Sequence, residues 1–446
     1  MIDAEELAAF ASVPAPTGAE EARVAWLERR LDGARGVRRR DAVGNLIWSF
    51  GDGRPELLIM AHVDTVFDAE VELSFQRDGD FLVGPGVGDN ATAVMATVWA
   101  LERIATPPPG LVVAFTVGEE GLGNLRGARR VCGDLDPARV IAVEGHGLDH
   151  VVIEHVGSVR ARLAISGPGG HSWRDRGTPS ALHALVGLAD KLVGEGVNVG
   201  RMTGGGAVNA IASAAEMLVE LRSLDDDELS AFEARLGQLR VAAPLSLACE
   251  VVGRRGAGQI DAGHPLVRSV MAARRTLGLG EAFGAGSTDA NAAAVLGIPA
   301  VGIGCAHGEG MHTVHERIDL ASLETGVRQL QAVLIPARAL DRRRGVRRPE
   351  LTGLSRASCA ARRRARDARE RAGPARRRAL CSVGDCGNCT HGRTPGGVRA
   401  FSPSMMGLSA PHSPRGRRVC TFHSPARPLA PDGLRACAAR CPPSWR

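Results

Sequence analysis

Short apolar runs alternate with segments of helical period over the first third of the chain. The runs 56–65, 111–120 and 139–146 are apolar for most of their length, which is typical of short buried strands. Between two of them, residues 90–105 have the composition of a buried helix. Alternation of this kind predicts a mostly parallel sheet covered by helices.

The pattern changes near residue 157, where apolar and polar residues begin to alternate. Such alternation is typical of a sheet with one solvated or helix-covered face. Pro179 suits the first turn of a helix, and the acidic run that begins at Asp225 suits the start of another. The elements expected here are strands over 158–169, 214–224 and 245–255 and helices over 178–192 and 225–240. We therefore expect a small α+β domain, with an antiparallel sheet and two helices, inserted into the first domain.

The alternation of short apolar runs with segments of helical period resumes after about residue 264. A strand is expected over 297–304 and a last helix over 320–340. The predicted fold class is mixed α/β, with a mostly parallel sheet flanked by helices and an inserted α+β domain. The expected domains are a first part over 1–156, the inserted domain over 157–263, a second part over 264–341 and a tail over 342–446.

The formal net charge of +6 combines two parts of opposite sign. From Arg342 to the end there are 24 Arg and 5 acidic residues, a net charge of +19, so residues 1–341 carry −13. The tail is rich in Arg, Pro, Ala, Ser and Cys without an amphipathic period, and cannot bury enough apolar surface to fold alone. Two interpretations fit it: an out-of-frame reading of a GC-rich gene, or a true basic and disordered tail. Its cysteines at 381, 386 and 389 have a metal-ligand spacing, but their flanks offer no strand or hairpin to hold them.

Residues 1–341 hold three widely spaced cysteines, Cys132, Cys249 and Cys305, which is typical of a reduced intracellular protein. The first residues lack the basic start and long apolar core of a signal peptide. No window reaches the roughly 18–20 apolar residues of a membrane span. We expect a cytoplasmic protein that does not span a membrane.

Side chains with acid–base and metal-binding chemistry follow the predicted strands. They are His62, Asp64, Asp89, Glu119, Glu120, Glu144 and His312. Ligands of parallel sheets bind at the carboxyl ends of the strands, so we expect these groups to converge. Two imidazoles and several carboxylates without a thiolate suit zinc, manganese or cobalt. Each residue alone also has an ordinary interpretation, such as a helix cap for Asp89, and their joint occurrence carries the prediction.

These motifs resemble the co-catalytic zinc peptidase and deacylase family, which includes acetylornithine deacetylase, succinyl-diaminopimelate desuccinylase, carboxypeptidase G and bacterial di- and tripeptidases. The segments that carry the resemblance are "AHVDT", "GPGVGDNATA", "GEEGLGN", "VEGHG" and "GMHTVHERI". It covers about residues 1–340 and leaves the tail without a counterpart. It implies an enzyme with two divalent metal ions, zinc first and cobalt or manganese as alternatives.

The resemblance also implies a role for each residue of the metal site. The implied ligands are His62 and Glu144 for one metal, Glu120 and His312 for the other, and Asp89 for both. Asp64 would orient the imidazole of His62, and Glu119 would be the general base. His312 fits the pattern better than His315, because Thr313 follows it and an acid lies beyond. His146, His150 and His155 are interpreted as neighbours of the site rather than ligands.

Substrate contacts are implied in the same way. His171 would reach the active site of a neighbouring subunit and stabilise the developing oxyanion, which implies a homodimer through the inserted domain. Asn209 and Arg222 resemble a substrate-contacting pair, with Arg222 suited to binding a carboxylate. Gly286 and Ser287 belong to a loop that substrate would approach.

One choice stays open: either Arg254 or Arg255 could add a second contact to an anion. The predicted function is metal-dependent hydrolysis of amide bonds in small peptides or N-acyl amino acids. The alternative is a non-catalytic binding protein on the same fold, whose basic tail binds nucleic acid by charge. The ligand set together with Glu119 favours the hydrolase, since a binding protein has no need of a positioned base.

Overall fold

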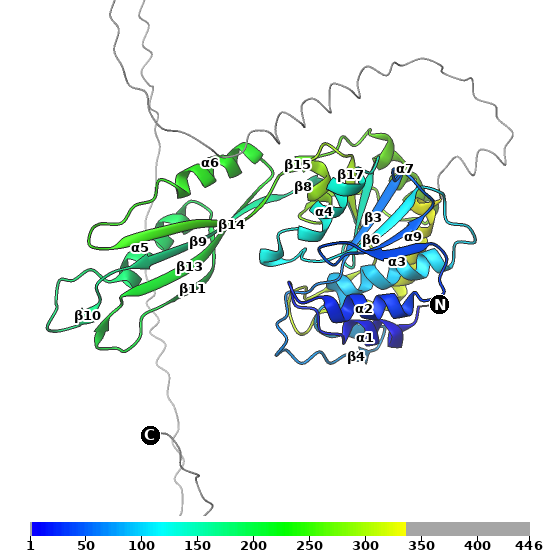
Figure 1. Ribbon diagram of the computed structural model, residues 1–446. Helices are drawn as coiled ribbons and strands as arrows, with labels where there is room; N and C mark the ends of the chain where they lie inside the picture. The colour runs from blue at the N-terminus through cyan, green and yellow to red at the C-terminus, as the bar shows by residue number, and fades with distance from the viewer. Residues whose placement is uncertain (1, 336–446) are drawn as a thin grey trace, which may run out of the picture. The chain divides into compact units, whose positions relative to one another are not determined.

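The structure is a computed structural model that describes residues 2–335 (Figure 1). The predictions for the tail, 342–446, lie outside the described residues. The helices are α1 (Ala4–Ala11), α2 (Glu21–Arg30), α3 (Ala93–Glu102), α4 (Arg126–Leu135), α5 (Ala181–Gly194), α6 (Asp226–Leu236), α7 (Pro265–Thr276), α8 (Ala290–Ala294) and α9 (Leu320–Leu334). The predicted mixed α/β class is confirmed.

A nine-stranded mixed sheet forms the larger part of the fold. Its strands are β1 (Val37–Arg40), β2 (Leu46–Phe50), β3 (Leu57–His62), β6 (Leu111–Thr116), β7 (Val140–Glu144), β8 (His150–His155), β15 (Gly258–Gln259), β16 (Ala282–Gly286) and β17 (Ala300–Gly304). The order is β1-β2-β6-β3-β7-β17-β8-β15, and β16 pairs with β8. The central strands β6, β3, β7 and β17 are parallel to their neighbours in this group, while β1, β2 and β15 pair antiparallel. The carboxyl ends of the four central strands therefore share one edge.

Helices cover both faces of this sheet because its central strands are apolar up to their last residue. All residues of β3 and β6 are buried. Side chains of α1, α3, α7 and α9 pack in the core on one face, and those of α4 and α8 pack in a second core on the other.

The predicted elements are present and most are shorter than predicted, while residues 336–340 of the last predicted helix lie outside the described residues. The strand predicted over 56–65 ends at His62, and the strand over 111–120 ends at Thr116, so the polar residues that follow lie in turns. The helix predicted from residue 90 begins at Ala93, because Asp89 and Asn90 in the preceding turn (Val87–Thr92) have non-helical backbone angles.

A second, antiparallel sheet is built from β9 (Gly157–Ser166), β11 (Asn198–Gly204), β13 (Ala214–Ser223) and β14 (Ser246–Arg255), in the order β11-β13-β9-β14. Alternate residues of β9 and β13 pack with α5 and α6 into a core of their own. We refer to this sheet and its two helices as the lid. Strand β11 was not predicted, because its sequence includes two glycines and has no apolar alternation, and none of its seven residues is buried. The domain boundaries at 157 and 263 stay a prediction.

Two small sheets position further segments. One pairs β10 (Gly170–His171) with β12 (Ala210–Ile211). The other has the order β18-β19-β5-β4, from β18 (Gly308–Glu309), β19 (Arg317–Asp319), β5 (Phe81–Val83) and β4 (Gln76–Asp78). Within residues 2–335, no helix combines the length and the apolar character needed to cross a bilayer. The cytoplasmic location stays a prediction.

Candidate active site

The five predicted metal ligands converge at the carboxyl edge of the large sheet. His62 ends β3 and Glu144 ends β7, while Glu120 lies in the turn after β6. Asp89 lies in the turn before α3, and His312 lies in the loop between β18 and β19. Because β6, β3 and β7 are adjacent and parallel, the polar groups after each strand end meet at one place.

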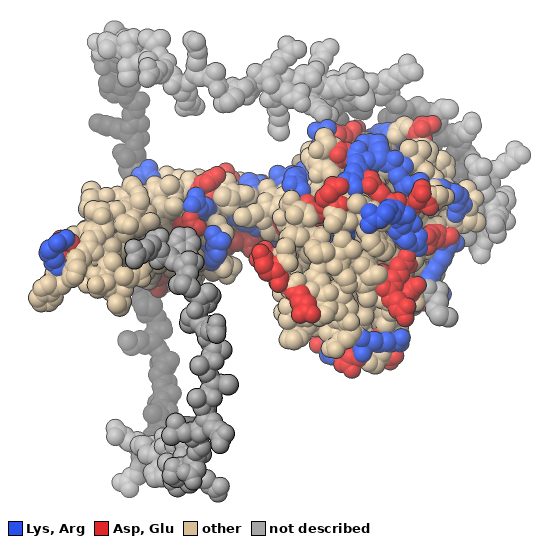
Figure 2. All heavy atoms as spheres, turned by 60° about the horizontal axis from the view of Figure 1, so that its bottom comes forward, with Lys and Arg blue, Asp and Glu red and all other residues tan. Residues whose placement is uncertain are grey.

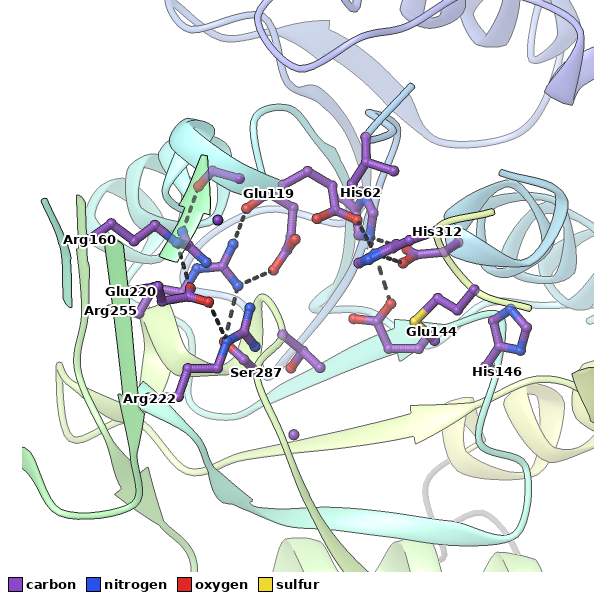
Figure 3. Close-up of a pocket in the computed structure, with 18 of the residues that line it drawn as sticks. His62, Glu119, Glu144, His146, Arg160, Glu220, Arg222, Arg255, Ser287 and His312 are labelled. Atoms are coloured by element: carbon purple, nitrogen blue, oxygen red, sulfur yellow. Dashed lines mark hydrogen bonds and ion pairs between the residues drawn. The ribbon is translucent and has the colours of Figure 1, made fainter. Parts of the chain in front are cut away.

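The carboxylate of Asp89 lies between the two imidazoles. Its Oδ1 is 3.1 Å from Nε2 of His62, and its Oδ2 is 3.0 Å from Nε2 of His312. Oε2 of Glu144 is 3.7 Å from Nε2 of His62, and Oε1 of Glu120 is 3.3 Å from Nε2 of His312. Figure 3 shows the two imidazoles and Glu144 pointing toward one another. Two groups of one imidazole and two carboxylates therefore share Asp89, and a third group joins His62 with Glu119 and Glu120.

Each group offers ligand atoms that all lie within 4.8 Å of one another. Three protein ligands of this kind leave a coordination position open, which is the pattern of catalytic rather than structural zinc sites. The side chains of each group therefore fit a divalent metal ion. Within residues 2–335, His146, His150 and His155 belong to none of the groups that could hold a metal.

The electrostatics of the cluster also favour cations. Burial raises the pKa of Glu144, although the nearby His62 opposes that shift. Hydrogen bonds to Asp89 and Glu120 raise the pKa of His312 to about 10. Crowded, buried carboxylates that raise the pKa of a neighbouring histidine form a region of negative potential, in which positive charge is stabilised.

Asp64 connects the ends of two strands. Its carboxylate accepts the backbone N–H groups of Glu119 at 3.0 Å and Glu120 at 2.9 Å, and the hydroxyl of Thr17 at 2.9 Å. Nδ1 of His62 lies 3.1 Å from the backbone carbonyl of Asp64 and 3.4 Å from its carboxylate. Asp64 therefore supports two parts of the site: the turn that carries Glu119 and Glu120, and the imidazole of His62.

Glu119 forms a buried ion pair with Arg255. Nη1 of Arg255 donates to Oε1 of Glu119 at 2.7 Å and to the Ser287 hydroxyl at 3.0 Å. Both charged side chains are almost fully buried. Arg254 instead pairs with Asp226 on α6. Of the two arginines, Arg255 lines the pocket and pairs with Glu119, so Glu119 is paired rather than isolated, and the choice of an anion contact stays a prediction.

A pocket of about 670 Å³ opens over the cluster. Of the predicted site residues, those that line it are His62, Asp89, Glu119, Glu120, Glu144, Arg222, Gly286, Ser287 and His312. Asp64 is fully buried beside it. His171 and Asn209 are not among the residues within 2–335 that line this pocket. They lie near each other, since the Ser172 N–H donates to the carbonyl of Asn209.

Two further residues of the pocket were not singled out in the sequence analysis. Arg160 on β9 and Glu220 on β13 line it from the lid, and their side chains are paired at 2.7 Å. His146 also lines it, with Nε2 at 2.5 Å from the buried carboxylate of Glu316. The alternation along β9 assigned Arg160 to the face opposite the apolar residues, but no local signal indicated that this face borders a pocket.

Comparison with known proteins shows the family of this chain. The model of peptidase family M20/M25/M40 matches residues 58–335. A probable carboxypeptidase of Neosartorya fischeri is 30% identical over 201 residues, which cover 38% of this chain and 45% of that relative. The chain therefore aligns with less than half the length of this curated relative.

Solved structures support the fold. A tripeptidase of Staphylococcus aureus has a TM-score of 0.60 and 21% identity, covering 75% of this chain and 98% of its own. An M20 family metallo-carboxypeptidase of Sulfolobus solfataricus has a TM-score of 0.60 and 14% identity, covering 75% and 99%. At these identities the likeness concerns the fold. Because the family model spans most of the described residues, the chain belongs to peptidase family M20/M25/M40.

Proposed function

We propose that this protein is a metal-dependent hydrolase that cleaves amide bonds in small peptides or N-acyl amino acids. The observation that carries the proposal is the pair of ligand groups that share Asp89, with Glu119 beside them in the same pocket. Membership of a peptidase family supports the same reaction class. A protein that merely binds peptides would not require this arrangement.

The ligands in the proposal are His62 and Glu144 for one ion, Glu120 and His312 for the other, and Asp89 for both. The donor set of imidazole and carboxylate suits zinc first, with cobalt or manganese as alternatives. When bound, such ions lower the pKa of a water molecule and polarise the carbonyl group of the substrate. Asp64 keeps the ligand turn in place through the backbone N–H groups of Glu119 and Glu120.

Glu119 is the general base in this proposal. Its carboxylate accepts the proton of the attacking water and then delivers it to the nitrogen of the leaving amine. Burial raises the pKa of Glu119, while the charge of Arg255 opposes that shift and favours the ionised form that can accept a proton. The hydrogen bond from Arg255 also fixes the direction of the carboxylate.

Arg222, Gly286 and Ser287 line the pocket and are proposed to contact the substrate. Arg222 suits a carboxylate group of the substrate. His171 and Asn209 are proposed to act in the active site of a second copy, across a homodimer formed through the lid.

The test is hydrolysis by the full chain loaded with zinc, manganese or cobalt. Dipeptides, tripeptides and N-acetyl amino acids are the substrates, and a chelator should abolish their turnover. Glu119→Gln should keep the metal content near that of the wild type and lower kcat at least about 100-fold, the range of general-base catalysis. Loss of metal together with activity would contradict the role of Glu119, and chelator-resistant turnover would contradict the metal-dependent mechanism.

A further inference from the structure

The helix-free face of the lid sheet carries an unusual concentration of arginines. Along β9, Val159 and Ala161 belong to the core beneath α5 and α6, so Arg160 and Arg162 lie on the opposite face. Two glutamates and two more arginines, from β11 and β13, share that face through their ion pairs. The members are Arg160, Arg162, Arg201, Glu216, Glu220 and Arg222.

These side chains form two groups in which two guanidinium groups share one carboxylate. In the first, Nε of Arg160 lies 2.7 Å from Oε1 of Glu220, and Nε of Arg222 lies 2.9 Å from Oε2. Although burial disfavours charge on Glu220, its hydrogen bonds to both arginines lower the pKa of its carboxyl group. Glu220 is therefore ionised, and the group retains one uncompensated positive charge.

The second group has the same composition in a different place. Arg162 and Arg201 share Glu216 on the same face. Arg162 and Glu216 are not among the residues within 2–335 that line the active-site pocket, whereas all three members of the first group line it. A substitution of Arg162 in the second group can therefore serve as the control for a substitution of Arg160 in the first group.

The first group lies directly beside the proposed catalytic residues. Nη1 of Arg160 donates to the carbonyl of Gly121, the residue after Glu120, at 2.5 Å. Figure 3 shows Arg160, Glu220 and Arg222 on the side of Glu119 that faces away from His62 and His312. The side chain of Arg222 is 51% exposed and reaches the open part of the pocket, while that of Arg160 is 10% exposed. A substrate bound at the cluster would extend toward these guanidinium groups.

The charges of the pocket limit which substrates suit it. Glu119 is paired with Arg255, so the positive charges of Arg160 and Arg222 face one carboxylate, Glu220. Arg201 adds a further guanidinium to the same wall, and its partner Glu216 is already shared with Arg162. A terminal carboxylate that pairs with Arg201 compensates the charge of the second group and leaves the charge of the first group, Arg160–Glu220–Arg222. A neutral side chain of the substrate would exclude water from that positive charge and would offer no negative charge in place of the lost hydration.

We infer that the group Arg160–Glu220–Arg222 is an anion subsite that selects substrates carrying an acidic side chain in addition to the terminal carboxylate. This inference rests on the proposed hydrolase function and names its substrate class: peptides or N-acyl derivatives of glutamate or aspartate. Arg160 is a specificity-determining residue here, because removing its guanidinium leaves a neutral Arg222–Glu220 pair.

The experiment compares substrates that differ by one charge and have nearly the same shape. For the full chain loaded with zinc, kcat/KM for alanyl-glutamate should exceed that for alanyl-glutamine at least about tenfold, as expected for a charge-assisted bidentate contact. Equal or reversed values would overturn the subsite and leave the hydrolase function intact, because turnover itself would have been observed.

Two variants test whether Arg160 causes the preference for alanyl-glutamate over alanyl-glutamine. Arg160→Gln should bring the ratio of the two kcat/KM values close to one, while Arg162→Gln should keep it near the wild-type ratio. The ratio compares two substrates on the same protein, so a smaller folded fraction does not change it. A preference that survives Arg160→Gln, or that falls equally in both variants, would overturn the assignment.

Binding of the products separates this inference from the proposed function. If neither dipeptide is hydrolysed, the hydrolase function fails, and calorimetry can still compare L-glutamate with L-glutamine on the zinc-loaded chain. Tighter binding of glutamate, lost in Arg160→Gln and kept in Arg162→Gln, would support the anion subsite. Equal binding of the two amino acids would overturn it.

Discussion

At the scale of single residues, the ion pair between Glu119 and Arg255 has the clearest energetic consequence. Both side chains are almost fully buried, so removing one partner leaves the other charge without compensation. We expect Arg255→Met to lower the free energy of unfolding of the metal-free protein by about 3–5 kcal/mol. Urea unfolding followed by circular dichroism measures this change.

The double variant Glu119→Gln, Arg255→Met tests whether the pair acts as a unit. Because it removes both charges, it should lose less stability than the two single changes added together, with a coupling of about 0.5–3 kcal/mol. Strict additivity would mean that the pair seen at 2.7 Å contributes no interaction of its own.

His155 predicts a dependence of stability on pH. Burial lowers its pKa from the ordinary value of 6.5, and its Nδ1 has no hydrogen-bond partner within the described residues. Below pH 6.5 the unfolded chain binds a proton at this position more readily than the folded protein does. The stability contributed by His155 is therefore complete above that pH and is lost as the pH falls.

His155→Gln should accordingly reduce the loss of unfolding free energy between pH 7.5 and 5.5, by about 1 kcal/mol. Thermal or urea unfolding at several pH values measures the difference between wild type and variant. His183→Gln, which removes an exposed histidine of α5, is the matched control and should leave the slope unchanged. An unchanged slope in His155→Gln would show that the buried imidazole titrates alike in both states.

Single residues could be predicted where their chemistry follows a strand end, and not where it depends on a distant partner. His62, Asp89 and Glu144 stood out because apolar runs or a glycine-rich turn precede them. Arg254 and Arg255 are neighbours in a strand, so their side chains lie on opposite faces of the sheet. The sequence alone does not indicate which of these faces borders Glu119.

At the scale of elements, Asp64 holds two strand ends in register. It follows β3 and accepts the backbone N–H groups of the turn after β6 with both of its carboxylate oxygens. We expect Asp64→Asn to weaken metal binding about 10–100-fold, the usual effect of removing a group that orients ligands, because an amide offers one acceptor oxygen where two are used. Metal titration with a competing chelator measures this loss.

Thr17→Val is the companion change, since the Thr17 hydroxyl donates to the same carboxylate. It leaves both backbone contacts in place and should weaken metal binding less than Asp64→Asn. If the two variants retain metal equally, support of the Glu119–Glu120 turn by Asp64 is not what sets the affinity.

The elements themselves followed from apolar periodicity, and the exceptions have physical causes. Within the described residues, strand β11 is largely exposed and pairs with β13 across a bulge. The period-2 signal of a half-buried strand is therefore missing from its sequence. Likewise, the small sheet that joins β5 and β19 brings together segments more than 200 residues apart, through three-residue strands too short to show a period.

At the scale of the whole molecule, the positive net charge comes from the part of the chain outside the described residues. Residues 1–341 carry −13, and on the face shown in Figure 2 acidic and basic side chains are interspersed. The match to the peptidase family ends at residue 335, and every proposed ligand lies between His62 and His312. Both observations assign the chemistry to the acidic part of the chain.

A chain that ends at residue 341 should therefore hydrolyse the same substrates with kcat/KM within about threefold of the full chain, because all proposed ligands and the last described helix, α9, are retained. Parallel measurement of salt-dependent binding to nucleic acid tests the alternative function, since charge alone would carry it and its affinity would fall steeply with salt. Retained hydrolysis with loss of nucleic-acid binding would assign the two properties to separate parts of the chain. Loss of hydrolysis in a shortened chain with native circular dichroism would instead show that residues after 341 contribute to the active site.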